Sequence, residues 1–287
     1  MASKPPKIDP VNGEFAAKIT GVNLAQPLDP YIFSTIQNAL HRYGVIFFPN
    51  QKLEPANLSS FTKNFGTPDI HHLAEHTFPK YPEVRVLSNA KKNGKLVGTF
   101  NGGHYWHSDL SFLSETGYVT ILYGIDCPPE GADTLFADMR AVHDALPEKT
   151  LAKLDGQQAV HDRNYRYSEL YPERPPLTPE QIAHVPPVNH PAIRTHPDTG
   201  RKSVFLVKEM VSKIGDLDET ASRALLEEIE TFMESGNFTY CHKWQAGDLV
   251  IWDNRCTLHT ATPYDTAKYS RTLYRTQVKG NAPFYTA

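Results

Sequence analysis

The chain has 287 residues, a length that allows one large domain or two small ones. Its composition, 40% hydrophobic and 21% charged, is that of an ordinary globular protein, so a sizeable core can form without disulfides or a structural metal. A formal net charge of −3 leaves no basic excess and argues against nucleic acid as a general partner. The three cysteines are widely spaced, and no apolar run approaches the length of a membrane span or marks a signal peptide. We therefore expect a cytoplasmic protein without a membrane partner.

Helices are predicted where apolar residues recur at helical spacing near a capping residue, a proline or a terminal glycine, at 31–43, 55–66, 138–146 and 218–233. The last helix is the clearest, because Asp218 can cap it. Its predicted buried stripe consists of Ala221, Leu225, Ile229 and Phe232. Strands are predicted in short apolar or alternating runs, at 45–48, 97–100, 107–112, 118–125, 134–137, 248–252 and 271–278. This order favours an α+β protein with helices around a mainly antiparallel β core.

No composition shift or linker divides the chain, so residues 1–287 are expected to form a single domain. The first ten residues contain three prolines and are expected to be a loose tail. Seven prolines lie from Pro172 to Pro191, in an irregular stretch that follows three tyrosines. We interpret 160–190 as a candidate lid, and a surface excursion without a role is an equal alternative.

The segment around His107 carries the main chemical signal. On a strand, residues two apart point to the same face, so His107 and Asp109 would project together. With a distant histidine they would form the two-histidine, one-carboxylate face that suits Fe(II) and leaves three coordination positions open. By itself His-x-Asp can arise by chance in a chain with 13 histidines. His259 strengthens the signal, because it follows a buried-type strand and a turn that could return the chain to the site.

Arg271 and Arg275 are four residues apart on a predicted strand and therefore share a face. Two guanidinium groups on one wall of a buried barrel are costly unless each meets an anion. Arginine suits the bidentate recognition of a carboxylate or sulfonate, so the pair suggests two anionic ligands side by side. The alternative is that both arginines pair with protein carboxylates or reach solvent.

At this point the sequence resembles the taurine dioxygenase / 2,4-dichlorophenoxyacetate dioxygenase (TauD/TfdA) family of Fe(II)/2-oxoglutarate oxygenases. The landmarks that carry the resemblance are short motifs at 44–48, 65–66, 106–109, 131–134, 194–197 and 252–255. The spacings agree as well: 24 residues separate Asp109 from Thr134, and 11 separate His259 from Arg271. The resemblance extends from Gly21 over nearly the whole chain and implies a double-stranded β-helix, a jelly roll of the cupin type.

The resemblance implies a role for each site residue. His107, Asp109 and His259 would be the iron ligands, and Arg271 with Thr134 would bind 2-oxoglutarate. Dioxygen would complete the reactants. The implied reaction releases succinate and CO2 and hydroxylates a C–H bond of a second substrate, with cleavage of C–O or C–S where the carbon bears a heteroatom.

Arg275 matches the family position that binds the acidic group of that substrate, and His71 matches a position that assists it in the taurine enzyme. Both favour a small anionic organic substrate. A carboxylate of the aryloxyalkanoate type is the first choice, and a taurine-like alkylsulfonate is the alternative. Family members are often dimers or tetramers, so a homo-oligomer is expected.

Two alternatives from other classes stay open at this stage. His72-x-x-Glu75-His76 fits the pattern of inverted zinc peptidases, although Pro68 and Pro79 leave little room for the helix that this chemistry needs. A barrel that senses a small acid without turnover is the second. A peptidase would work with zinc alone, and a sensor would bind its ligand without producing succinate.

Overall fold

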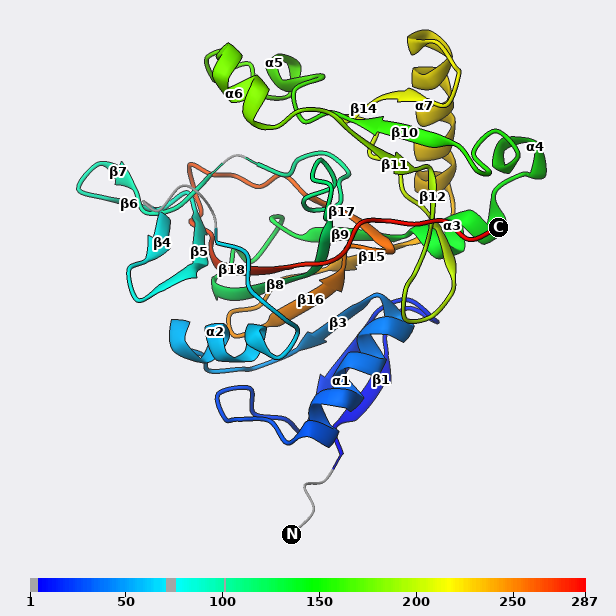
Figure 1. Cartoon of the computed structure of the whole chain (residues 1–287). Coiled ribbons are helices and arrows are strands. Elements are labelled where there is room, and N and C mark those ends of the chain that lie inside the picture. The colour runs from blue at the N-terminus through cyan, green and yellow to red at the C-terminus, as the bar shows by residue number, and fades with distance from the viewer. Residues whose placement is uncertain (1–4, 71–75, 101) are drawn as a thin grey trace.

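The computed structural model describes residues 5–70, 76–100 and 102–287 (Figure 1). An eight-stranded sheet forms the centre of the protein, antiparallel except where β2 and β3 run parallel. Its strands are, in spatial order, β1 (Lys7–Pro10), β2 (Ala17–Thr20), β3 (Val45–Phe48), β16 (Leu249–Asp253), β8 (Gly117–Asp126), β18 (Thr272–Lys279), β5 (Tyr81–Ser88) and β4 (Thr77–Phe78). Strands from both ends of the sequence therefore lie next to one another at its middle.

A second, three-stranded sheet packs on one face of the large one. It contains β15 (Thr239–His242), β9 (Thr134–Asp138) and β17 (Thr257–Ala261). Phe136 from this sheet shares a buried cluster with Trp252 and Leu273 from the large sheet. Two facing antiparallel sheets with this strand order form the jelly roll, so the predicted double-stranded β-helix is confirmed.

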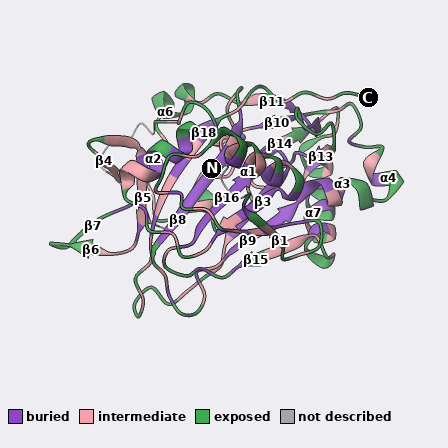
Figure 2. Cartoon of the chain, turned by 90° about the horizontal axis from the view of Figure 1, so that it is seen from below, coloured by how far each residue is buried: buried purple, intermediate pink, exposed green. Residues whose placement is uncertain are grey.

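Helices α1 (Pro30–Tyr43) and α2 (Pro55–Lys63) cover the outer face of the large sheet (Figure 2). Their apolar stripes meet the buried side chains of β3 and β16, which are the purple strands near the middle of that view. Asp29 caps α1 by accepting a hydrogen bond from the Tyr31 amide, and Pro30 occupies the first turn. Gly44 ends the helix with φ 72°, in the left-handed region that favours glycine.

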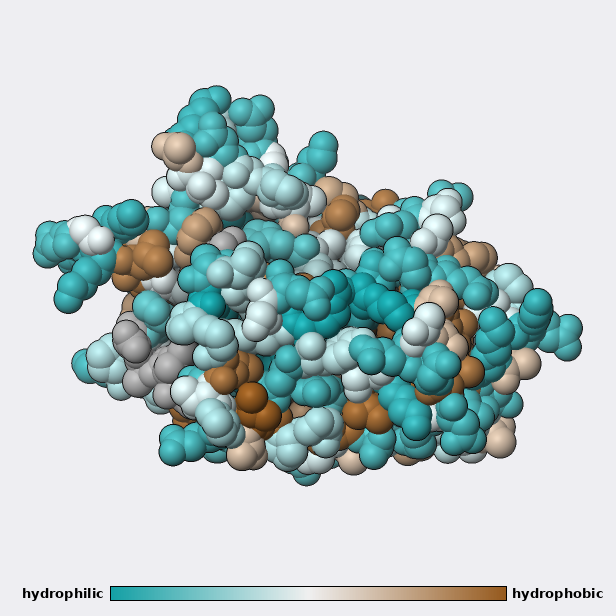
Figure 3. Space-filling model, turned by 90° about the horizontal axis from the view of Figure 1, so that it is seen from above, coloured by the Kyte–Doolittle hydropathy of each residue, from teal (hydrophilic) through white to brown (hydrophobic). Residues whose placement is uncertain are grey.

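A second core surrounds α7 (Glu219–Ser235), which Asp218 caps as predicted. Short helices accompany it, namely α3 (Met139–Ala145), α4 (Glu148–Leu151), α5 (Tyr167–Leu170) and α6 (Pro179–His184). The small strands are β10 (Gln158–His161), β11 (Val188–Pro191), β14 (Val211–Ile214), β12 (Ile193–Thr195), β13 (Lys202–Val204), β6 (Lys91–Lys92) and β7 (Lys95–Leu96). The β6–β7 hairpin forms the hydrophilic projection at the left of Figure 3. Among the described helices, none combines the length and apolarity that crossing a bilayer requires.

Several predicted elements differ from the structure. The strand expected over 97–100 is wrong: only Thr99 bridges β5 there, and Val97 is 37% exposed, so this apolar run is not buried in a sheet. The strand expected over 107–112 is also wrong. Only His107 pairs, and Leu110 has φ 58°, which turns the chain out of an extended path. Lys7–Pro10, expected in a loose tail, form the edge strand β1 instead.

The buried stripe of α7 is rotated from the prediction. Leu225 and Ile229 are buried as expected, but Ala221 and Phe232 are only partly buried. Ser222 takes the inward position because its hydroxyl accepts a hydrogen bond from the Ile214 amide at 3.1 Å, which joins α7 to β14. The segment between β10 and β11, which contains most of the stretch predicted as a lid, carries α5 and α6 and extends away from the barrel (Figure 1).

Candidate metal and 2-oxoglutarate site

His107, Asp109 and His259 converge between the two sheets. The nitrogen and oxygen atoms that they could offer to a metal all lie within 4.8 Å of one another. His107 is held by paired main-chain hydrogen bonds with His259 on β17, of 3.0 and 2.8 Å. Asp109 and Leu110 lie in a turn, and the Asp109 carboxylate lies 3.9 Å from His107 Nε2 and 3.7 Å from His259 Nε2. A turn, rather than the expected strand, therefore brings the predicted ligands together.

The Asp109 carboxylate has two partners besides the imidazoles. Arg275 Nη2 donates to Oδ1 at 2.5 Å, and the Thr120 hydroxyl donates to Oδ2 at 2.6 Å. The Asp109 amide donates to the Asn254 side-chain carbonyl at 3.1 Å. These contacts fix the direction of the carboxylate before any metal binds.

The protonation states suit metal binding. Burial opposes ionisation of Asp109, but the guanidinium of Arg275 and the neighbouring rings hold the pKa of this carboxyl well below its usual range. Burial lowers the pKa of both His107 and His259, so their rings are neutral at pH 7. His107 Nδ1 donates to the Tyr105 carbonyl at 2.8 Å, which leaves the lone pair of Nε2 directed toward the site. Two neutral imidazoles and one carboxylate fit a divalent transition metal.

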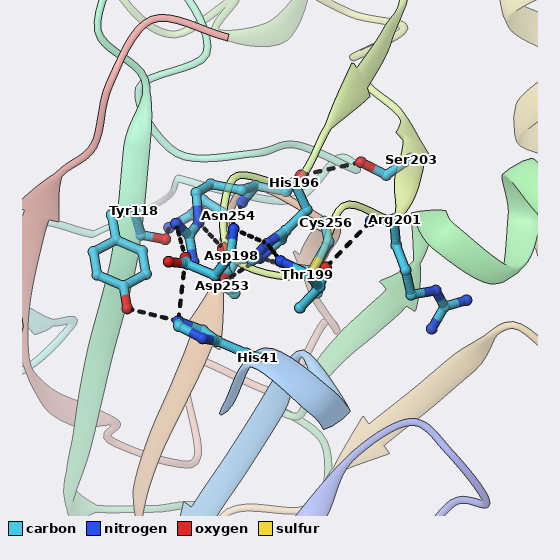
Figure 4. A network of polar contacts seen from close by, with 12 residues as sticks. His41, Tyr118, His196, Asp198, Thr199, Arg201, Ser203, Asp253, Asn254 and Cys256 are labelled. Atoms are coloured by element: carbon cyan, nitrogen blue, oxygen red, sulfur yellow. Dashed lines mark hydrogen bonds and ion pairs between the residues drawn. The ribbon is translucent and has the colours of Figure 1, made fainter. Parts of the chain in front are cut away.

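A second cluster of possible ligands, His196, Asp253 and Cys256, does not have this character (Figure 4). The amides of Asp198 and Thr199 donate to His196 Nδ1, so Nε2 carries the proton and donates to Asp253 at 3.0 Å. Burial raises the pKa of the Cys256 thiol to about 12, which keeps it protonated. The cluster is therefore a structural network that anchors the turn between β16 and β17.

A cationic cluster consists of Thr134 at the start of β9, Trp244 after β15 and Arg271 just before β18. Trp244 donates from its indole nitrogen to the Thr134 hydroxyl at 3.0 Å, and the Arg271 guanidinium lies 6.0 Å from the Trp244 ring centre. The Arg271 amide is fixed by the Asn89 side chain at 2.8 Å. Among the described residues, the buried Arg271 Nε meets no hydrogen-bond partner, and burial lowers the pKa of this guanidinium. A buried cation without a protein anion is suited to an anionic ligand.

The structure thus brings together most of the residues that the sequence singled out. It places Arg275 against Asp109, which agrees with the alternative that an arginine meets a protein carboxylate. Residues 71–75 lie outside the described part of the chain. They include His71, expected to assist the substrate, and His72 and Glu75 of the zinc motif. Sequence reasoning missed Thr120, whose only signal is a polar side chain within a long, almost continuously buried strand.

Comparison with known proteins gives the class of the chain. The family model "Taurine catabolism dioxygenase TauD, TfdA family" matches residues 7–277, so the chain belongs to this family. It is 34% identical over 269 residues to the alpha-ketoglutarate-dependent 2,4-dichlorophenoxyacetate dioxygenase of Cupriavidus pinatubonensis, covering 90% of this chain and 92% of that protein. It is 30% identical over 283 residues to the alpha-ketoglutarate-dependent sulfate ester dioxygenase of Pseudomonas putida, with coverages of 96% and 90%.

A solved structure agrees with these relatives. The crystal structure of AAD-2 in complex with Mn(II) and N-oxalylglycine matches with a TM-score of 0.82 and 28% identity, over 98% of this chain and 100% of that one. The chain is therefore an Fe(II)- and 2-oxoglutarate-dependent dioxygenase that acts on a small organic molecule. The expected reaction class and cofactors are confirmed, and the family assignment supports neither the zinc peptidase nor the sensor.

Proposed function

We propose that His107, Asp109 and His259 hold Fe(II), and that the enzyme hydroxylates a small anionic organic substrate. The single observation that carries this proposal is the convergence of two neutral imidazoles and an ionised carboxylate within 4.8 Å. When bound, iron and 2-oxoglutarate would activate dioxygen, which supplies the oxidising power for the reaction. The protein supplies the orientation of the ligands and of both organic acids.

Arg271 and Thr134 are proposed to bind 2-oxoglutarate. The free hydrogen-bonding capacity of the buried Arg271 guanidinium supports a carboxylate partner. The Thr134 hydroxyl oxygen accepts a hydrogen bond from the Trp244 indole N–H, so the hydroxyl proton is available for a hydrogen bond to a ligand oxygen. Binding the distal carboxylate at this depth would fix the co-substrate at one end and orient the other end toward the iron ligands.

Arg275 is proposed to bind the anionic head group of the prime substrate. Its guanidinium touches Asp109 at 2.5 Å, so an anion held there would lie beside the metal residues. The aryloxyalkanoate and sulfate ester activities named for the relatives both involve an acidic group. A carboxylate is the first choice for this chain, with a sulfonate as the alternative, and His71 is proposed to assist.

The α5–α6 segment is proposed to act as a lid. Tyr171, directly after α5, places its hydroxyl 3.5 Å from that of Tyr105. The Tyr105 ring in turn lies against His107, with ring centres 5.3 Å apart. Through this contact the segment reaches Tyr105, which packs against the proposed ligand His107. Movement of the segment would therefore open or close the substrate entrance.

The cellular setting is also a proposal. Cys127, Cys241 and Cys256 are all free, which suits a reducing cytoplasm. The formal net charge of −3 also argues against nucleic acid as a partner. A homo-oligomer, expected from the family, is tested by light scattering coupled to size-exclusion chromatography.

The decisive experiment measures succinate release from 2-oxoglutarate in the presence of Fe(II), O2 and a panel of small carboxylates and sulfonates. Substrate-dependent release is expected, with the highest rate for an aryloxyalkanoate. Activity with zinc and without 2-oxoglutarate would indicate a peptidase. Ligand binding without any succinate would indicate a sensor.

A further inference from the structure

A buried amide side chain contacts the backbone of the proposed ligand Asp109. Asn254 lies in the turn between β16 and β17 and is 1% exposed. Its side-chain oxygen accepts from the Asp109 amide at 3.1 Å and from the Trp252 indole nitrogen at 3.0 Å. Its side-chain nitrogen donates to the Thr120 hydroxyl at 3.0 Å and to the Tyr118 carbonyl at 3.4 Å. The hydrogen-bonding capacity of this amide is therefore fully used inside the protein.

The partners of Asn254 determine which way its amide points. A backbone N–H and an indole N–H can only donate, so the Asn254 atom that both of them reach must be the oxygen. The atom beside Thr120 is then the nitrogen, which has no free lone pair and can only donate. The Thr120 hydroxyl oxygen therefore accepts from Asn254, and its own proton must point to another group.

The strand register supplies a second donor to the same hydroxyl. Thr120 on β8 lies directly opposite Gln277 on β18, and side chains at opposite positions of an antiparallel pair project from the same face. Gln277 Nε2 donates to the Thr120 hydroxyl oxygen at 3.3 Å. Thr120 is fully buried, so the remaining partner of its hydroxyl is the Asp109 carboxylate, at 2.6 Å from Oδ2. The Thr120 proton is therefore directed at one carboxylate oxygen.

The backbone of Asp109 is held as firmly as its side chain. The Asp109 amide donates to Asn254, and the Asp109 carbonyl accepts from the Gly117 amide at 3.2 Å. A Cβ atom at Gly117 would lie 2.7 Å from the Asp109 carbonyl oxygen, so this close approach requires glycine. A hydrogen bond from a hydroxyl to an ionised carboxylate is charge-assisted and belongs to the stronger ones. Both the position of Asp109 and the rotation of its carboxylate are therefore restricted.

We propose that Asn254 and Thr120 are positioning residues for Asp109, with Asn254 and Gln277 setting the direction in which the Thr120 hydroxyl donates. The inference rests on the proposed function, because it takes Asp109 as a metal ligand, and it adds residues that are not ligands themselves. A carboxylate that is held in one orientation loses less freedom when a metal binds. Removal of such an outer partner typically weakens metal binding by about 10–100-fold.

The test changes the Thr120 hydroxyl and measures the dissociation constant for Mn(II) by titration in electron paramagnetic resonance. Thr120→Val has nearly the same shape without the hydroxyl, and it is expected to bind Mn(II) at least about tenfold more weakly than the wild type. Thr120→Ser retains the hydroxyl and is expected to stay within about threefold of the wild type. Thr120→Cys, whose thiol is a weak donor, is expected to lie between these two variants.

A double variant tests whether Asn254 acts through Thr120. Asn254→Ala is also expected to weaken Mn(II) binding, because it removes the acceptor of the Asp109 amide and one donor to Thr120. Combined with Thr120→Val, its effect is expected to be smaller than the product of the two single effects, since the two side chains belong to one network. Effects that multiply in full would show that Asn254 does not act through Thr120.

Thr150→Val is the matched control. Thr150 is 3% exposed, and its hydroxyl donates at 2.5 Å to Glu228, a carboxylate of α7 that is not part of the metal site. This variant is expected to lose stability in urea unfolding while its Mn(II) affinity equals that of the wild type. The same measurement on the Thr120 variants separates a positioning role from a loss of stability.

Three results would overturn the inference: Mn(II) binding by Thr120→Val within about threefold of the wild type, equal weakening in the serine and valine variants, or the same weakening in Thr150→Val. His259→Ala in the same titration tests the proposed ligands separately. Undiminished Mn(II) binding by His259→Ala would reject the proposed function. Its loss together with full binding by Thr120→Val would reject the positioning role alone.

Discussion

Replacement of Arg271 by glutamine tests the assignment of the 2-oxoglutarate pocket most directly. Glutamine keeps much of the side-chain length but removes the charge and the planar fork that can hold a carboxylate through two hydrogen bonds. Loss of a buried, charge-assisted pair of contacts costs about 3 kcal/mol, which corresponds to a roughly 150-fold weaker binding of 2-oxoglutarate. We expect this loss in the dissociation constant of the Mn(II)-loaded protein and in the apparent KM.

The structure provides a reporter for this experiment. The Trp244 ring lies 6.0 Å from the Arg271 guanidinium, so 2-oxoglutarate bound there is expected to change tryptophan fluorescence. In the absence of 2-oxoglutarate the variant is expected to be at least as stable as the wild type, because the substitution removes a buried charge whose Nε has no partner among the described residues. This combination of weaker binding and unreduced stability separates a ligand-binding role from a structural one.

Arg201→Gln is the matched control, because this guanidinium is 43% exposed and pairs with Asp144 on the surface. Its affinity for 2-oxoglutarate is expected to equal that of the wild type. An Arg271→Gln variant that binds 2-oxoglutarate within threefold of the wild type would refute the reasoning. So would a variant that loses affinity only because it has lost stability.

Three further predictions concern the metal, acid stability and the buried network. Asp109→Asn is expected to abolish turnover and weaken Mn(II) binding at least about tenfold while keeping the fold, as measured by Mn(II) titration in electron paramagnetic resonance and by circular dichroism. His161 is fully buried with its pKa lowered, mainly by burial, from 6.5 to about 3, so the unfolded chain takes up its proton first and stability is lost as the pH falls from 6.5 toward 3. His161→Phe is expected to remove about 2 kcal/mol of the loss between pH 7 and 5, measured by urea unfolding at both values. Asp253→Asn leaves the buried Arg255 without its main anion and is expected to cost about 3–5 kcal/mol in urea unfolding at pH 7.

Each of these predictions has an outcome that contradicts it. Undiminished succinate production by Asp109→Asn would remove this residue from the ligand set. An acid-induced loss of stability as large in His161→Phe as in the wild type would show that this ring does not control it. For the buried network, Asp198→Asn is the control: Asp198 also contacts Arg255 at 2.7 Å but is 44% exposed, so a cost below about 1 kcal/mol is expected. Similar costs for the two aspartate variants would contradict the view that burial sets the energy.

The sequence alone was sufficient for features that depend on local spacing. The capping residue Asp218 and the proline at the start of α2 act between residues a few positions apart, so the printed sequence contains their cause. The chemical nature of His107, Asp109 and His259 likewise indicated the kind of metal that they could hold.

The tertiary structure decided how distant segments meet. Asp109 reaches the site from a turn with Leu110 and not from a strand, and local alternation cannot reveal a backbone that leaves the extended region. The position of Arg275 opposite Arg85 depends on the register between β5 and β18, which are far apart in the sequence. Its contact with Asp109 depends on the packing of the segment around Asp109 against β18. Register is set by side-chain packing across the whole sheet, so the charges that surround Arg275 are determined only when the strands are paired.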